Sequence, residues 1–556
     1  MSPLSSPSWH PSAAYLRLWP LAASALVLLP WLNPFSFGPT SPALQWLVTL
    51  AAVAGLLLLG AVWHAAVPQA KAPWAHSIAW GWLLAGLLSS LIGLVQYLGA
   101  SAAWAPWVNV NEVGKAFANL RQPNQFATLT NMALAAVCWV VVQAKPGVAA
   151  GGWALRWWPA VAALVLAAGN AASSSRTGFL QLLLVLALGW LWGAWRNAAV
   201  RRVLLAAAMG YAVALLVLAL GWWWGAWRNV AVRRVLLAAA MGYAVALLVL
   251  PLLIGLGPLA LGALGRFQDD AQPCTSRLVL WRNVLDLIAQ RPWLGWGWGG
   301  LDYAHYTTLY PGGPDDRFCA ILDNAHNLPL QLAVELGLPV ALLLCGAFTW
   351  WVLRQKPWRE PDATRQLGWA VLALIGLHSL LEYPLWYGPF LMAVGLCCVL
   401  LWRGEPVTRP AAARWTAAGL VAWGLVVAAA TAYAAWDYNR ISQLYLAPEA
   451  RDADYRHDTA TKVGGTWLFR DQVRFAYVTT VPVTRANAAA VFPMAEDLLH
   501  FSPEPRVIEP LIESASLLGE DGVAAAHIRR YRAAFPQEFA AWSALNKLYA
   551  DTLAAP

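Results

Sequence analysis

The sequence predicts an all-α, polytopic membrane protein with about 11–12 transmembrane helices, one large loop and a soluble helical tail. Of its 556 residues, 60% are hydrophobic and only 12% are charged, and the mean hydropathy is +0.52. Soluble domains carry about 25% charged residues. The net charge of +9 does not indicate a nucleic-acid partner, because the arginines fall in short groups between apolar runs, which is typical of topology signals.

Candidate transmembrane helices are apolar runs of about 20 residues, the length that crosses a bilayer core. The first run has Arg17 near its start and no small-residue cleavage site after it, so we expect a retained helix rather than a signal peptide. The predicted spans are 15–32, 42–63, 76–98, 126–143, 157–172, 179–195, 203–222, 235–256, 328–353, 366–381, 387–402 and 415–435.

Positive charges in the short connections predict which side each loop faces, because Lys and Arg are enriched on the cytoplasmic side. The predicted cytoplasmic connections carry Lys71, Lys145 with Arg156, Arg196 with Arg201 and Arg202, the segment 354–365, and Arg403 with Arg409 and Arg414. The predicted connections on the opposite face are 33–41, 99–125, 173–177, 265–326 and 382–387.

An internal repeat disturbs this alternation. The segment from Trp192, WGAWRNAAVRRVLLAAAMGYAVALLVL, recurs 32 residues later from Trp224, nearly letter for letter. We interpret the tandem segment 192–250 as a duplicated helix, not a solenoid. One added crossing would move every later loop to the other side of the membrane. It would also place Arg228 on the opposite side from Arg196, its counterpart in the first copy. We therefore predict that one copy is displaced, tilted or interfacial, and that the later helices keep their topology.

The composition changes after the last span and predicts two domains. Residues 1–436 form the membrane domain, with the long loop 265–326, and residues 437–556 form a soluble, mostly helical domain. Within the tail, the stretch ESASLLGEDGVAAAHIRRYRAAFPQEFAAW indicates a helical hairpin like those of TPR repeats. The charge pattern places this tail on the same side as the long loop.

The six cysteines divide into two groups. Cys138, Cys345, Cys397 and Cys398 lie in apolar spans, where a thiol behaves as a small hydrophobe. Cys274 and Cys319 both lie in the 265–326 loop. A disulfide between them is possible if the loop faces an oxidising compartment, and two free thiols remain the alternative.

Two arginines are candidate anion-binding residues. Arg176 lies between two apolar helices on the face where a topology arginine is not expected, although an arginine at a helix end can also extend to lipid headgroups. Arg277 begins an amphipathic stretch that continues to Arg291. Alternatively, Arg277 lies on the solvated face of a surface helix. This alternative is stronger for Arg282 and Arg291. Arg176 predicts an anion site. Because arginine binds phosphate oxygens in a bidentate way, Arg277 predicts a phosphate site.

His326 is the candidate general base. It precedes Asn327, which can cap the following helix, and the helix N-terminus together with nearby arginines disfavours a positive imidazole. A neutral imidazole can accept a proton. The alternative is a hydrogen-bonded structural histidine at the membrane entrance.

The segment 378–387, HSLLEYPLWY, places His378, Glu382 and Tyr383 at the edge of a span. Ionisable groups there are costly enough to suggest function, but a hydrogen bond between helices explains them equally well. The amides of Gln122 and Asn124 suit either sugar hydroxyls or a helix cap. The doublets Asp269-Asp270 and Asp315-Asp316 are expected to be solvated, so we expect no metal site and no cofactor.

Five motifs together carry a family resemblance: RQPNQFAT at 121–128, SSSRTGFL at 173–180, SRLVLWRNVLDLIAQRPWLGWGWG at 276–299, DNAHNLPLQLAVELG at 323–337 and HSLLEYPLWY at 378–387. In this order they resemble the O-antigen ligase and polymerase superfamily. The last motif and the soluble tail are most similar to bacterial protein O-oligosaccharyltransferases of the PglL/PilO type.

The resemblance implies a metal-independent transferase in the bacterial inner membrane. It would move a preassembled glycan from undecaprenyl pyrophosphate, on the periplasmic side, to Ser or Thr hydroxyls of a pilin-like exported protein. Arg176 and Arg277 would hold the pyrophosphate, and His326 would deprotonate the acceptor. Further substrate-binding residues are expected among Gln122, Asn124, Arg282, Asn324, His378, Glu382 and Tyr383. The duplicated segment, which lies just after the SRTG motif, departs from the family pattern.

Other functions remain open at this point. The same superfamily contains O-antigen ligases, which transfer to the lipid A core of lipopolysaccharide, and polymerases that extend the glycan. A transporter of lipid-linked sugars is a third class, but it would be expected to show symmetry between two halves. The repeat found here is one duplicated helix.

Overall fold

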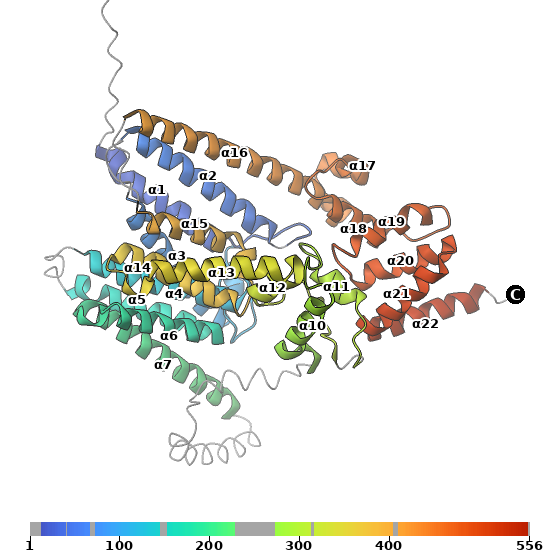
Figure 1. The fold of residues 1–556 in the computed structure, drawn as a ribbon, viewed down its shortest axis with the longest axis horizontal. Coiled ribbons are helices and arrows are strands. Elements are labelled where there is room, and N and C mark those ends of the chain that lie inside the picture. The colour runs from blue at the N-terminus through green and yellow to red at the C-terminus, as the bar shows by residue number, and fades with distance from the viewer. Residues whose placement is uncertain are drawn as a thin grey trace, which may run out of the picture.

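The computed structural model is all-helical over the residues that it describes, which are 13–40, 42–66, 73–144, 153–227, 273–312, 316–403 and 410–553 (Figure 1). This confirms the predicted fold class. Five helices are long and apolar enough to cross a membrane, and four more are apolar but shorter. The chain is therefore a multi-pass membrane protein.

The helices of the membrane domain follow the predicted apolar runs closely, since each run is hydrophobic on nearly all sides. Their bounds are α1 Ala13–Leu32, α2 Ala43–Ala66, α3 Trp74–Tyr97, α4 Pro123–Gln143, α5 Trp153–Ala172, α6 Arg176–Leu191, α7 Ala198–Trp227, α14 Ala363–Ser379, α15 Gly388–Leu401 and α16 Pro410–Ser442. Helices α2 and α16 lie side by side along one edge of the bundle (Figure 1).

Helix α4 lies at the centre of the bundle and is the most enclosed of the five long spans, with 78% of its apolar window buried. It packs against α3, α5, α6 and α14. Small residues permit this close approach: a side chain at Gly86 would collide with Ala133, and one at Gly178 would collide with Ala127. Small residues serve the same purpose at other membrane helix contacts. The first turn of α4 is thereby held at a fixed place in the bundle.

The prediction of one continuous span over 328–353 was wrong, because the structure breaks it at Gly337. Helix α12 covers Leu328–Leu336 and α13 covers Leu338–Gln355. Gly337 has a φ of +84°, and a Cβ there would overlap the Trp293 carbonyl. The Trp296 N–H donates to the Val334 carbonyl at 2.9 Å. The loop segment 292–297 therefore docks on the break, and glycine permits both the conformation and the approach.

The long loop and the tail form a second group of helices beside the bundle (Figure 1). In the loop, α10 covers Arg277–Gln290 and α11 covers Leu301–Thr307. Helix α16 runs without interruption past residue 436 to Ser442 and leads into the tail. The tail helices are α17 Thr459–Val463, α18 Arg470–Thr480, α19 Ala488–Leu498, α20 Pro505–Leu518, α21 Asp521–Ala534 and α22 Pro536–Leu553.

The predicted hairpin of the tail is formed by α20 and α21, which pack against each other. Gly519 ends α20 in the left-handed conformation, as is common at helix C-termini. The tail core contains Ile508, Leu511 and Tyr531, together with Tyr306 from the loop. Loop and tail thus share one hydrophobic core.

The duplicated segment is described only in part. The first copy continues from α6 through a turn at Gly193, where φ is +66°, into α7. Most of the second copy, with Arg228, Arg233 and Arg234 and the predicted span 235–256, lies outside the described residues, as do Asp269, Asp270 and Asp315. The expected displacement of one copy stays a prediction.

Candidate functional site

Both candidate arginines occupy the same local position, the first residue of a helix capped by a serine. Ser175 caps α6 by accepting a hydrogen bond from the Gly178 N–H, and Ser276 caps α10 by accepting one from the Val279 N–H. Serine is a favoured N-cap because its oxygen satisfies an unpaired backbone donor. Each arginine therefore adds its charge to the positive end of a helix dipole.

Glu382 is the centre of the candidate site. Its Oε1 lies 2.6 Å from Nη2 of Arg277 and accepts a hydrogen bond from the Asn124 amide at 3.1 Å. Its Oε2 lies 2.6 Å from Nδ1 of His326 and 3.4 Å from the Gln122 amide nitrogen. The Glu382 side chain is only 8% exposed. One buried carboxylate thus joins residues from three distant parts of the chain.

The ionisation of Glu382 is fixed by these partners. Burial raises its pKa, but the hydrogen bond from His326 and the charges of His326 and Arg277 oppose this effect, and the net result is a lowered pKa. An ionised carboxylate can only accept hydrogen bonds, so Nδ1 of His326 carries the proton. The remaining ring nitrogen, Nε2, is then left available as a base.

His326 is held in an unusual backbone conformation. Its φ is +50°, in the left-handed region that residues other than glycine rarely adopt. The next residue, Asn327, caps α12 by accepting a hydrogen bond from the Leu330 N–H, and its amide donates to the Leu380 carbonyl at 3.0 Å. The cap was predicted from sequence and is confirmed. The imidazole packs edge-on against Tyr383, with ring centroids 4.9 Å apart.

Arg176 is connected to the site through its neighbour. Ser175 donates a hydrogen bond to Asn124 at 2.6 Å, and the amide of Asn124 bonds Glu382. Arg176 itself is exposed at the start of α6. The N-termini of α4, α6, α10 and α12 therefore gather around Glu382, which makes this region favourable for an anion.

Among the remaining expected site residues, Arg282 and His378 have structural partners, whereas His378 Nε2 and Asn324 Oδ1 are buried without a hydrogen-bond partner among the described residues. Arg282 forms an exposed ion pair with Asp316 at 3.1 Å. His378 is fully buried, and its Nδ1 lies 2.9 Å from Thr128 Oγ1, which links α14 to α4. Asn324 is buried beside the site, and its Oδ1 has no hydrogen-bond partner among the described residues. The amides of Gln122 and Asn124 contact Glu382 and do not cap α4.

Sequence reasoning missed the residues behind the site. Gln181 bonds Thr128 at 2.9 Å and the Leu374 carbonyl at 2.9 Å, so α4, α6 and α14 are joined by buried polar contacts. Ser175 was read only as part of a motif. Its position directly before Arg176, matched by Ser276 before Arg277, was the available signal.

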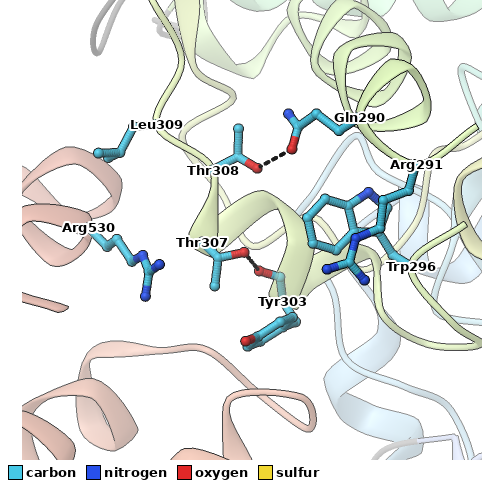
Figure 2. A pocket seen from close by; sticks show the side chains of 8 residues that line it. All are labelled: Gln290, Arg291, Trp296, Tyr303, Thr307, Thr308, Leu309 and Arg530. Atoms are coloured by element: carbon cyan, nitrogen blue, oxygen red, sulfur yellow. Dashed lines mark hydrogen bonds between the residues drawn. The ribbon is translucent and has the colours of Figure 1, made fainter. Parts of the chain in front are cut away.

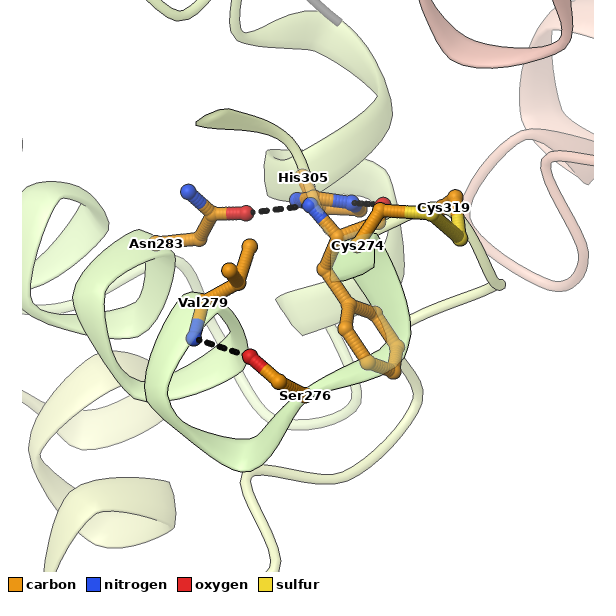
Figure 3. Close-up of a disulfide and its surroundings, with 7 residues drawn as sticks. Cys274, Ser276, Val279, Asn283, His305 and Cys319 are labelled. Atoms are coloured by element: carbon orange, nitrogen blue, oxygen red, sulfur yellow. Dashed lines mark hydrogen bonds between the residues drawn. A yellow bond between two sulfur atoms is a disulfide. The ribbon is translucent and has the colours of Figure 1, made fainter. Parts of the chain in front are cut away.

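Cys274 and Cys319 form a disulfide in the structure (Figure 3). It joins the start of the loop to the segment that precedes His326, and Asn283 of α10 holds the same segment by accepting a hydrogen bond from the Phe318 N–H at 2.8 Å. Burial lowers the pKa of His305 to about 3, so its imidazole is neutral. Its Nε2 donates a hydrogen bond to the Phe318 carbonyl at 2.9 Å, and its Nδ1 accepts one from the Tyr310 hydroxyl at 2.8 Å. These contacts fix the loop against α10.

No group of three or more His, Cys, Asp or Glu side chains that could hold a metal ion is found among the described residues. The polar groups gathered at the site are instead arginine, histidine, amide and carboxylate. The arginines and amides can bind an anionic ligand, and the imidazole can accept a proton.

Three segments of the chain match models of known protein families. Residues 116–140 match the model described as protein glycosylation ligase, residues 210–345 match O-antigen ligase, and residues 366–550 match the C-terminal part of virulence factor membrane-bound polymerase. The resemblance to the O-antigen ligase and polymerase superfamily is confirmed. The three matched segments contain Asn124, Arg277 with His326, and Glu382, respectively.

The chain is also similar to two oligosaccharyltransferases of Acinetobacter baylyi (strain ATCC 33305 / BD413 / ADP1). It is 31% identical over 133 residues to the general O-oligosaccharyltransferase, which covers 23% of this chain and 22% of that protein. It is 27% identical over 124 residues to the ComP-specific O-oligosaccharyltransferase, covering 22% of each chain. The chain thus matches less than a quarter of the length of either relative.

Proposed function

We propose that this protein transfers a preassembled oligosaccharide from undecaprenyl pyrophosphate to Ser or Thr hydroxyls of exported, pilin-like proteins. The observation that carries the proposal is the contact of one buried carboxylate, Glu382, with both Arg277 and His326 at 2.6 Å. A phosphate-binding group and a proton acceptor are thereby held together.

The donor pyrophosphate would lie at the gathered helix N-termini, with Arg277 and Arg176. The Arg277 side chain is 42% exposed although its Nη2 is bound to Glu382, so part of the guanidinium remains accessible to phosphate oxygens. Negative charge increases on the pyrophosphate as the glycosidic bond breaks. Fixed cations there stabilise the transition state more than the ground state.

The acceptor would be activated by His326. Its Nε2 takes the proton of the acceptor hydroxyl, the hydroxyl oxygen forms a bond with the anomeric carbon, and undecaprenyl pyrophosphate leaves with the electron pair of the broken bond. Glu382 keeps the proton on Nδ1 and offsets the positive charge that develops on the imidazole. The Tyr383 ring limits the rotation of the imidazole.

Charge and redox chemistry support a periplasmic position of the site. The short connections rich in Lys and Arg predict a periplasmic position for the loop in a bacterial inner membrane. The disulfide between Cys274 and Cys319 supports this position, because such bonds persist in oxidising compartments.

A second candidate function is transfer to the lipid A core of lipopolysaccharide, or extension of the glycan. The matches to O-antigen ligase and to the membrane-bound polymerase favour it. The match of residues 116–140 to protein glycosylation ligase and the name of the ComP-specific relative favour the protein acceptor.

The acceptor class can be tested directly. Membranes that contain the chain are supplied with undecaprenyl-pyrophosphate glycan together with either a pilin-like protein or lipopolysaccharide core. We expect glycan on Ser or Thr of the protein. Glycan on the core alone would overturn the proposal in favour of the ligase. The mechanism is tested separately by the variants described in the Discussion.

A further inference from the structure

A cavity of about 460 Å³ lies between the long loop and the tail, away from Glu382. The loop contributes most of its walls, and α21 of the tail contributes Arg530 (Figure 2). The lining residues are Gln290, Arg291, Trp296, Tyr303, Thr307, Thr308, Leu309 and Arg530. Cavities of this volume are typical of sites for small ligands or single chemical units of larger ones.

The walls of the cavity are held by contacts between loop and tail. The Tyr306 hydroxyl lies 3.0 Å from Nδ1 of His527 in α21, and both groups are buried. Tyr303 stacks on His500, with ring centroids 3.7 Å apart. The shared hydrophobic core lies behind these contacts. The cavity is therefore preformed rather than a gap between independent domains.

The cavity is positively charged. Arg291 lies over the Trp296 ring, with 4.0 Å between the guanidinium carbon and the ring centroid, and Arg530 extends from the opposite wall (Figure 2). Neither guanidinium forms an ion pair with an acidic side chain in the part of the chain that the structure describes. Two such groups facing one cavity favour a carboxylate or another anion.

The neutral lining residues suit a sugar ring. Gln290, Thr307 and Thr308 offer amide and hydroxyl groups, and the Thr308 hydroxyl already bonds Gln290 at 3.4 Å. Trp296 and Tyr303 offer aromatic surface to the apolar C–H groups of a pyranose. An acidic peptide would be held by the same charges, but the concave shape and the cluster of neutral hydrogen-bonding groups match a sugar more closely.

The cavity lies at one end of α10 and the candidate site at the other. Arg277 is the first residue of this helix and Gln290 is the last. At 1.5 Å per residue, the 14-residue helix is about 20 Å long. The cavity is therefore too far from Arg277 to bind the same pyrophosphate, but a glycan of several sugars whose reducing end lies at Arg277 can extend toward it.

We propose that this cavity binds a carboxylated sugar of the glycan, several units away from the bond that is broken. The proposal rests on the proposed oligosaccharide transfer and adds the chemical class of the sugar to it. Arg291 and Arg530 bind the carboxylate, and the Gln290 and Thr308 side chains bind ring hydroxyls. A glycan that lacks an acidic sugar is held less tightly.

Isothermal titration calorimetry with the full chain in detergent tests this proposal without any transfer step. The probes are tetragalacturonic acid, its neutral methyl ester and tetraglutamate. We expect the acid sugar to bind at least about tenfold more tightly than its ester, the effect of one lost charge-assisted hydrogen bond or more. The variants Arg291→Gln and Arg530→Gln should each weaken its binding by about tenfold. Arg529→Gln, an exposed neighbour on α21, is the matched control and should bind normally.

Three results would overturn the proposal: equal binding of acid and ester, unchanged binding in both arginine variants, or tetraglutamate binding as tightly as the acid sugar. The last result would identify a site for acidic peptide. Thermal unfolding of each variant shows that it is folded. The variant His326→Ala should bind the acid sugar normally. Sugar binding is therefore measured independently of transfer, and the failure of one proposal can be told from the failure of the other.

Discussion

Nδ1 of His326 lies 2.6 Å from Oε2 of Glu382, although the two residues are 56 positions apart in the sequence. The lowered pKa of Glu382 keeps it ionised, so it accepts a hydrogen bond from the protonated Nδ1. Nε2 is then available to act as a base. The same carboxylate contacts Arg277 through its other oxygen. The proposed base and the arginine proposed to bind phosphate therefore have a fixed relative position.

Replacement of His326 removes the proposed base. We expect His326→Ala to lower the rate of glycan transfer by about 10²–10⁴-fold, the usual contribution of a positioned general base. Transfer is measured in membranes as glycosylated acceptor per unit of membrane-bound chain. The matched control is His457→Ala, at an exposed position of the tail, which should transfer normally. Near-normal transfer by His326→Ala would remove this residue from its role.

Replacement of Arg277 by lysine keeps the charge but removes the planar fork. We expect Arg277→Lys to lower transfer by about 10–100-fold, because an ammonium cannot bind Glu382 and a phosphate oxygen with the same geometry. The control is Arg529→Lys on the tail surface. If Arg277→Lys transfers as well as the parent chain, transfer does not need a planar guanidinium that contacts Glu382 and phosphate together.

The Glu382 contacts also predict how stability depends on pH. The pKa of this group is below its ordinary value of 4.5 in the folded chain, so the ionised form stabilises the fold. Its contribution is complete above about pH 4.5 and is lost as the pH falls through the lower, folded value. We expect the Tm difference between the parent chain and Glu382→Gln not to shrink between about pH 7 and 4.5, and to close below that. A difference that closes above about pH 5.5 would contradict this assignment.

Gly337 should be essential to the docking of the loop. A side chain there would overlap the Trp293 carbonyl, and the φ of +84° is itself unfavourable for alanine. We expect Gly337→Ala to destabilise the protein by more than about 1 kcal/mol and to reduce transfer by displacing the loop. Gly346→Ala in the same region is the control, because no atom lies within 4 Å of its added Cβ. Equal Tm values for the two variants would show that the docking of segment 292–297 does not depend on the helix break at Gly337.

The sequence predicted most of the helices because their signal is local. The apolar runs that became α1 to α7 and α14 to α16 are visible by hydropathy alone, and the cap at Asn327 is visible from one residue type before a helix. The break at Gly337 was hidden because residues on both sides are apolar. Its signal was the Gly337-Leu338-Pro339 sequence, which combines a residue suited to a positive φ with a proline suited to a helix start.

The candidate site was predicted by residue but not by arrangement. Arg277 and His326 were predicted from their own surroundings and the family resemblance, whereas the central position of Glu382 depends on contacts with residues 56 and 105 positions away. No local pattern encodes such contacts. Glu382 was grouped with substrate-binding residues for this reason, and Arg282 was placed among them although it pairs with Asp316 at the surface.

The most direct test of the account is the transfer rate of Glu382→Gln, measured with saturating donor and acceptor. The amide keeps the size of the side chain but removes the charge that holds Arg277 and fixes the proton on His326. We predict a loss on the order of a hundredfold or more, with Glu112→Gln, at an exposed loop position, transferring normally. Transfer within about twofold of the parent chain would contradict a site organised by Glu382.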